Sequence, residues 1–303
     1  MTLRIAYFGL PLGAVVLLHG GFDLVSIALG HPDALGARRV RRRAKGLLMA
    51  KPSLDDPSLV ASIAAQKPDA ILSWFWPKRI PPSVLSIAPR GAFGVHPSLL
   101  PRHRGGDPYF HALLEGDSET GVTLHRLDAA YDTGAIVDAI SLPIGEDENA
   151  WQLARRMDRP SLRLLLRCAE RLQHGERLEG TPQNDALATM AEPPSEDDLA
   201  IDWDRDAAYL TRLCRAAGPT PGAIAQLGDT LVAVLSARAI DDAPAVLEPG
   251  EAFFVDGSVR VRTGRGALAL DHVRIEETED EAGDLHVGQE LRGAAIARLV
   301  PRV

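Results

Sequence analysis

Residues 94–106 read Gly-Val-His-Pro-Ser-Leu-Leu-Pro-Arg-His-Arg-Gly-Gly, a short apolar run that leads a histidine into a loop broken by proline and glycine. We predict a strand over 93–95 with His96 at its carboxyl end. Ligands of open α/β sheets gather outside the carboxyl ends of strands, so this position favours a functional role for His96. Asp132 follows 36 residues later, in a turn that continues with Thr-Gly. The two side chains form a candidate pair of a base and its orienting acid.

The chain around this stretch predicts an α/β domain. Apolar runs over 3–8, 22–29 and 70–74 are typical of buried strands, and they alternate with helical patterns over 12–18 and 57–65. Such alternation predicts a parallel sheet. After the loop we expect a helix over 109–114, strands over 121–126 and 134–142, and a long helix over 149–172.

A polar stretch that contains proline and glycine, residues 174–200, indicates a linker. We therefore place a catalytic domain at 1–175, a linker at 176–198 and a second domain at 199–303. The second domain opens with a helical pattern over 205–216. Short β-rich runs follow over 231–237, 252–255, 258–261 and 267–273, at the spacing of a small barrel.

Length and composition indicate a globular protein of two ordinary domains, with 303 residues, 46% hydrophobic and 24% charged. No apolar run reaches the roughly 18 residues that a membrane helix needs. Gly9 and Pro11 divide the apolar amino-terminal stretch into a strand and a helix start, which argues against a signal peptide. Cys168 and Cys214 lie far apart in unlike segments, so we expect no disulfide framework, no metal site and a cytoplasmic location.

Charge is unevenly distributed along the chain. The net charge is −8, and residues 191–303 carry 21 acidic and 11 basic side chains. The one basic cluster, at 38–45, reads Arg-Arg-Val-Arg-Arg-Arg-Ala-Lys. Such a run is typical of a solvated surface, and contact with a polyanion is the alternative.

The segment His-Pro-Ser-Leu-Leu-Pro-x-x-Arg-Gly at 96–105 and the Asp-Thr-Gly turn at 132–134 closely resemble the 10-formyltetrahydrofolate-dependent formyltransferases, above all the methionyl-tRNA formyltransferase branch. The resemblance covers nearly the whole chain, including 4–9, 201–208 and 218–222. It implies a Rossmann-like catalytic domain followed by a small OB-like β-barrel domain. It also implies transfer of a formyl group from 10-formyltetrahydrofolate, as co-substrate, to an amine.

The resemblance assigns roles to the paired residues. His96 takes or shuttles the amine proton and hydrogen-bonds the developing oxyanion, while Asp132 orients the imidazole and relays the proton. The candidate catalytic residues are His96, Asp132, Gly94 and Ser98.

Gly94 departs from the family pattern, which has an asparagine two residues before the histidine. Loss of one oxyanion donor typically costs about 10²–10³ in rate. Three explanations stay open. In the first, the donor comes from another group: Ser98, His103, a water or the substrate. In the second, the missing side chain makes room for a larger acceptor. In the third, the reaction is lost or altered, as in a formyl-folate hydrolase or an inactive folate-binding homologue.

For the folate, the resemblance points to the loop at 74–80, Leu100 and the turn at 128–131. Aromatic and apolar walls with exposed backbone groups suit a flat pterin. Trp74 and Phe75 are alternatively core residues, and Arg104 either clamps an anion or braces the loop. The candidate folate contacts are Trp76, Pro77, Lys78, Ile80, Leu100, Arg104, Asp128, Ala129 and Tyr131.

The acceptor is predicted from charge. Nucleic-acid affinity depends on Lys and Arg contacts with phosphates, yet the second domain is acidic and contains no lysine. The segments at 107–111 and 123–128 also resemble small-molecule formyltransferases more than the tRNA enzymes. We therefore expect a small-molecule amine, such as an amino sugar or a hydroxylated ornithine. A tRNA is the less favoured acceptor, which the cluster at 38–45 keeps open.

Overall fold

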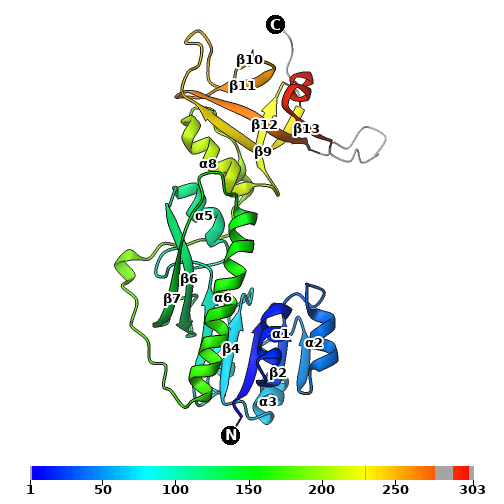
Figure 1. Ribbon diagram of the computed structural model, residues 1–303, viewed down its shortest axis with the longest axis vertical. Coiled ribbons are helices and arrows are strands. Elements are labelled where there is room, and N and C mark those ends of the chain that lie inside the picture. Colours follow the sequence, from blue (N-terminus) through cyan, green and yellow to red (C-terminus); the bar gives the residue numbers. More distant parts are fainter. Residues whose placement is uncertain (1, 229, 277–288, 300–303) are drawn as a thin grey trace. The chain divides into compact units, whose positions relative to one another are not determined.

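The computed structural model describes residues 2–228, 230–276 and 289–299, and the contacts among them divide the chain into two units (Figure 1). The first unit comprises Met1–Pro108, Glu119–Pro143 and Arg155–Glu192, and the second comprises Tyr109–Ser118, Ile144–Ala154 and Pro193–Val303. The predicted second domain includes residues 277–288 and 300–303, which lie outside the described residues. The boundaries placed at 175 and 199 stay predictions.

A seven-stranded sheet forms the centre of the first unit, in the order β3-β2-β1-β4-β5-β6-β7. Its strands are β1 (Arg4–Gly9), β2 (Asp23–Leu29), β3 (Leu47–Ala50), β4 (Ala70–Trp74), β5 (Ala92–His96), β6 (Glu119–Arg126) and β7 (Ile136–Pro143). Strands β1 to β5 are parallel, whereas β6 pairs antiparallel with both β5 and β7. The predicted Rossmann-like α/β fold and its parallel amino-terminal strands are confirmed, and the antiparallel strand β6 makes the complete sheet mixed.

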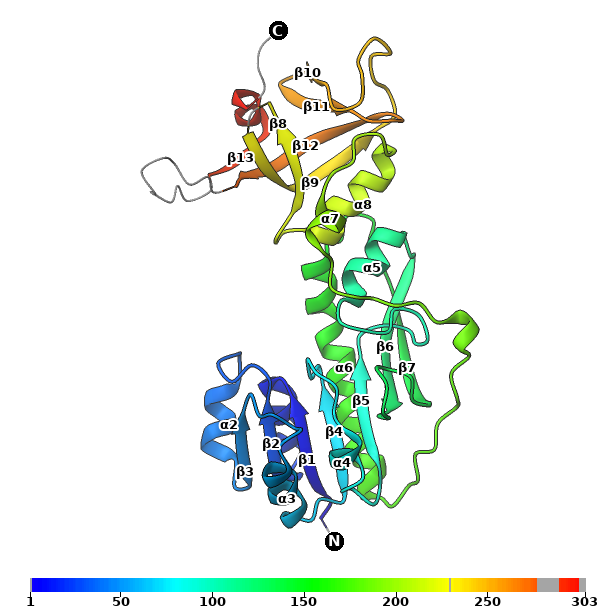
Figure 2. The ribbon, with the colours of Figure 1, turned by 180° about the vertical axis from the view of Figure 1, so that it is seen from behind.

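Helices cover both faces of this sheet. The helices of the first unit are α1 (Pro11–His19), α2 (Ala37–Arg43), α3 (Pro57–Ala65), α4 (Pro82–Leu85) and most of α6 (Ala150–Gln173), whereas α5 (Pro108–Glu115) belongs almost entirely to the second unit. Helices α1 and α6 lie on one face (Figure 1), and α3 and α4 lie on the other (Figure 2). Phe8 of β1 packs in one core cluster with Ile63 of α3 and Val84 of α4. On the opposite face, the indole Nε1 of Trp74 donates a 2.8 Å hydrogen bond to Ser161 Oγ of α6.

Local sequence explains where α3 begins. Asp56 is its N-cap, and the carboxylate accepts a 2.9 Å hydrogen bond from the backbone N–H of Ser58. Pro57 occupies the first helical position, where a missing N–H costs nothing. The helix therefore starts at the residue expected from the sequence.

The second unit contains an antiparallel sheet in the order β10-β11-β12-β9-β8, with β13 paired to β12. Its strands are β8 (Ala223–Leu227), β9 (Thr230–Ile240), β10 (Ala252–Val255), β11 (Ser258–Arg262), β12 (Ala267–Ile275) and β13 (Glu290–Arg292). Helices α7 (Glu196–Leu199) and α8 (Ala207–Ala217) and the 3₁₀ helix η2 (Gly293–Arg298) also belong to this unit, whereas the 3₁₀ helix η1 (Asp185–Leu187) belongs to the first. The antiparallel β-rich second domain is thus confirmed. In the part of the chain that is described, no helix combines the length and apolar character needed to span a bilayer.

Candidate active site

His96 is the last residue of β5 and is only 6% exposed. It lies opposite Thr123 in the β5–β6 ladder. The Thr123 hydroxyl donates to the carbonyl of Ser98 at 2.7 Å and accepts from the backbone N–H of Leu100 at 3.2 Å. Strand β6 therefore holds the start of the loop that follows His96.

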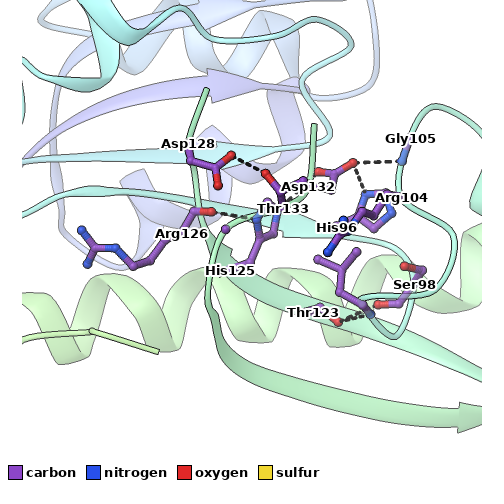
Figure 3. Close-up of polar contacts among 12 residues, drawn as sticks. His96, Ser98, Arg104, Gly105, Thr123, His125, Arg126, Asp128, Asp132 and Thr133 are labelled. Carbon is purple, nitrogen blue, oxygen red and sulfur yellow. Dashed lines mark hydrogen bonds and ion pairs between the residues drawn. The ribbon is translucent and has the colours of Figure 1, made fainter. Parts of the chain in front are cut away.

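The structure brings His96 and Asp132 together (Figure 3). The Nδ1 atom of His96 lies 3.4 Å from Oδ2 of Asp132. The same carboxylate oxygen accepts a 3.0 Å hydrogen bond from the backbone N–H of Gly105. Asp132 adopts a left-handed backbone conformation with φ 55°, which aspartate tolerates better than most residues that carry a side chain.

The hydrogen bonds of the His96 ring define where its exchangeable proton lies. Its Nε2 atom is 2.7 Å from the backbone carbonyl oxygen of His103. A carbonyl oxygen only accepts, so Nε2 donates, and Nδ1 carries the lone pair of the neutral ring. A hydrogen bond between Nδ1 and Asp132 then requires one additional proton, on either the imidazole or the carboxyl. The two groups are therefore close enough to share one proton.

His125 is a site residue that sequence reasoning did not single out. Its side chain is buried, and its Nε2 atom lies 3.5 Å from Oδ1 of Asp132. The Nδ1 atom donates to the carbonyl of Arg126 at 2.9 Å, which leaves the lone pair on Nε2. Burial lowers the pKa of His125, the negative charge of Asp132 opposes that shift, and positive charge on His96 adds to it. Asp132 therefore lies between two imidazoles, of which His125 tends to be neutral.

Gly94 does not leave an open space. It lies opposite His125 in the ladder, and a Cβ atom at position 94 would be 2.7 Å from Cδ2 of Leu127 and 3.2 Å from Nε2 of His125. A side chain at this position requires Leu127 to shift. The side chains of Leu127 and His125 already occupy the space where a Cβ atom would lie. The structure therefore does not support the explanation that glycine makes room for a larger acceptor.

Ser98 has a role inside the loop. Its side chain is fully buried, and its hydroxyl donates a 2.7 Å hydrogen bond to the carbonyl of Arg102. This hydroxyl proton is used to shape the turn between His96 and Arg104. It is not free to act as the replacement oxyanion donor in this conformation.

Arg104 braces the loop. Its guanidinium Nε and one terminal nitrogen donate to Oε1 of Gln183 at 3.1 and 2.8 Å, and the same terminal nitrogen contacts Asp185 at 2.8 Å. Gln183 belongs to the predicted linker, yet the backbone N–H of Ala191 in the same stretch donates to the carbonyl of Arg104 at 2.7 Å. The polar composition of this stretch gave no indication that it packs against the site. It was therefore missed.

The two segments expected to contact the folate lie together. The hydroxyl of Tyr131 accepts a 3.2 Å hydrogen bond from the backbone N–H of Arg79, and the Arg79 guanidinium donates to the carbonyl of Ala129 at 3.3 Å. Asp128 shapes its turn by accepting from the hydroxyl of Thr133 at 2.7 Å. The loop thus joins the turn, with Pro77 and Lys78 exposed at its tip.

Ile80 of this loop and Leu100 of the loop after His96 are 5% and 7% exposed, so both side chains are buried. The Nε1 atom of Trp76 is buried and has no hydrogen-bond partner among the described residues. A buried donor without a partner is costly, and a polar ligand group would satisfy it. Trp76 therefore fits a bound heterocycle with acceptor atoms.

The chain is similar in sequence to known formyltransferases. A family model described as formyl transferase matches residues 28–168, and one described as formyl transferase, C-terminal domain, matches residues 195–284. A methionyl-tRNA formyltransferase from Methylobacillus flagellatus is 33% identical over 286 residues, which cover 90% of this chain and 92% of the relative.

Solved structures show the same fold at low identity. HypX from Aquifex aeolicus, crystallised with tetrahydrofolic acid, superposes with a TM-score of 0.65 at 19% identity. That match covers 99% of this chain, which spans 48% of HypX. An N-formyltransferase from Helicobacter canadensis, bound to folinic acid and dTDP-3-aminofucose, gives a TM-score of 0.64 at 16% identity and covers 89% of this chain and 99% of that one.

Proposed function

The chain belongs to the formyl transferase family, and from this premise we propose that His96 and Asp132 serve formyl transfer to the amine of a small molecule. The enzyme is a formyltransferase that uses 10-formyltetrahydrofolate as its one-carbon co-substrate. The observation that carries the proposal is the 3.4 Å approach of His96 Nδ1 to Asp132 Oδ2 at the end of β5. The cytoplasm is the proposed compartment.

The reaction needs a group that holds one proton. The bond between N10 of the folate and the formyl carbon breaks, and a bond from the acceptor nitrogen to that carbon forms. The acceptor nitrogen loses a proton, and N10 gains one. The proton position between His96 Nδ1 and Asp132 Oδ2 serves this exchange.

The co-substrate is proposed to bind at the joined loop and turn. Trp76, Pro77, Lys78 and Ile80 form one wall together with Leu100, and Asp128, Ala129 and Tyr131 form the other. The unpartnered Trp76 Nε1 supplies a donor, and irregular backbone supplies further hydrogen-bonding groups for a pterin. Arg104 supports this wall through Gln183 and Asp185 rather than clamping an anion.

A small amine is the proposed acceptor because of the charge of residues 191–303. Their 21 acidic side chains against 11 basic ones repel a polyanion. The dTDP-3-aminofucose bound by the Helicobacter canadensis enzyme is an amine of the proposed class.

Charged initiator tRNA is the second candidate, favoured by one observation besides the names of the relatives. Helix α2 buries Ala37 and Val40 and exposes all five of its arginines. Arg39, Arg42 and Arg43 line a surface hollow of about 510 Å³ together with His19. Among these, Arg43 bonds Nδ1 of His19 at 3.1 Å.

An acceptor screen tests the proposal. The protein is incubated with 10-formyltetrahydrofolate and, separately, an amino-sugar nucleotide, N-hydroxyornithine, charged initiator tRNA, or no amine. Release of tetrahydrofolate and of formate is measured in each. Formylated small amine supports the proposal, and formylated tRNA assigns the second candidate. Formate release without any amine identifies a hydrolase, and no turnover with any of them contradicts the assigned chemistry.

Charge removal separates the two acceptors. Arg39→Gln with Arg42→Gln should leave transfer to a small amine unchanged. If tRNA is the acceptor, the same double variant should weaken binding and flatten its salt dependence.

A further inference from the structure

Gln183 forms hydrogen bonds with every polar atom of its side-chain amide. Its Nε2 atom donates to the backbone carbonyls of Asp132 at 2.7 Å and Gly134 at 2.8 Å. Its Oε1 atom accepts from Nε and a terminal nitrogen of Arg104 at 3.1 and 2.8 Å. Two hydrogens and two lone pairs are all that such an amide offers, so the group is fully used.

The partners of Gln183 also fix its orientation. A carbonyl only accepts and a guanidinium only donates, so the amide cannot be turned over without losing all four bonds. The orientation is therefore dictated by the chemistry of the neighbours.

These contacts close a ring through Asp132. The carboxylate of Asp132 accepts from the N–H of Gly105, the residue after Arg104. Arg104 donates to Gln183, and Gln183 donates back to the carbonyl of Asp132. Asp132 is thus held at both its side chain and its backbone by two groups linked to each other.

We propose that Gln183 is a positioning residue that sets the place of the Asp132 carboxylate relative to His96. It acts through Asp132. The inference rests on the proposed function only for its kinetic test, because the placement of the two rings beside Asp132 is measurable without any substrate.

Two substitutions separate the functions of the amide. Gln183→Met removes both ends of it. Gln183→Glu keeps an acceptor for Arg104 but removes the donors, and it puts a carboxylate against the carbonyls of Asp132 and Gly134. Asn184→Ala is the control, because Asn184 caps the next turn of the same segment by accepting from the N–H of Ala186 at 3.1 Å.

The ring nitrogens of ¹⁵N-labelled histidines report the result by NMR, with a His96→Gln protein used to assign the His96 signals. We expect the His96 signals to move in both Gln183 variants and to stay unchanged in Asn184→Ala. With an acceptor from the screen, kcat should fall about 10- to 100-fold in both, with the KM for the folate unchanged.

Unchanged His96 signals in Gln183→Glu would overturn the proposal, as would full kcat in that variant. Gln183→Met could instead lower the unfolding midpoint and leave the histidine signals as in wild type. That result would mean that Gln183 only stabilises its own segment, and it would also reject the positioning role. If the wild-type protein turns over no acceptor, the NMR comparison still decides the question.

Discussion

Gly94 and His125 face each other across the β5–β6 ladder, at the place where a Cβ atom on residue 94 would come within 3.2 Å of the His125 Nε2 atom. His125 in turn lies 3.5 Å from Asp132. The position at which the family pattern has an asparagine is thus next to a buried imidazole that reaches the proposed acid. A side chain at residue 94 would therefore contact the imidazole that lies beside Asp132.

We predict that Gly94→Asn lowers activity on the native acceptor. The new Cβ would lie 2.7 Å from Cδ2 of Leu127, which is the end of a flexible side chain and can shift at small cost, but it would also lie 3.2 Å from Nε2 of His125 and so crowd the ring beside Asp132. Gly94→Asn combined with Leu127→Ala should recover part of the lost activity, because the second change vacates the crowded space. Steady-state rates and urea unfolding of the three proteins measure this. A large gain in rate for Gly94→Asn alone would contradict it and indicate that a lost oxyanion donor had been restored.

His96→Ala and Asp132→Asn should each lower kcat by about 10²–10⁴, the usual contribution of general acid–base catalysis. Asparagine keeps an oxygen for the N–H of Gly105 and tolerates the left-handed conformation at residue 132, so the turn is preserved. We expect unfolding midpoints close to wild type in both. Near-native rates in both variants would show that the site is misassigned.

Much of the first unit was predictable because its strands are buried on both faces and read as continuous apolar runs. Residues 57–65 and 70–74 match α3 and β4, and the strand that ends at His96 was expected. Helix α2 was not predicted as an element, because five arginines hide the spacing of its two buried residues, Ala37 and Val40. The short strand β3 that follows it was missed with it.

The pairing of His96 with Asp132 was expected from sequence, but the third partner was not. His125 is set beside Asp132 by the antiparallel pairing of β6 with β5, a tertiary relationship that no local pattern reveals. Gln183 was overlooked for a related reason. Its segment has the polar composition of a linker, and only the observed bonds to Arg104 and Asp132 distinguish it from one.

A reduced folate should bind saturably near Trp76. Trp76→Phe keeps the aromatic ring but removes the buried indole donor that lacks a partner, so it should weaken binding of 5-formyltetrahydrofolate by about 0.5–1.5 kcal/mol. Isothermal titration measures the change, and Trp203→Phe in the second unit is the matched control. No binding at millimolar folate by the wild-type protein would refute the site. Equal affinity in wild type and Trp76→Phe would remove Trp76 from it.

The pKa of His125 predicts an acid-sensitive contribution to stability. Burial lowers this pKa below its ordinary value of 6.5 in the folded protein, so the unfolded chain binds more protons at this residue once the pH falls through about 6.5. The free energy of unfolding is then lost toward acid pH, by up to about 1.4 kcal/mol for each unit of pKa difference.

His125→Gln removes this titrating group, so its free energy of unfolding should fall less than that of wild type between about pH 7 and about pH 5. Urea unfolding across that range measures the difference, and His174→Gln at an exposed histidine controls for the loss of one imidazole. Equal acid losses in wild type and His125→Gln would mean that the ring beside Asp132 is protonated as readily in the folded protein as in the unfolded chain. In that case the negative charge of Asp132 would cancel the effect of burial on the pKa of His125.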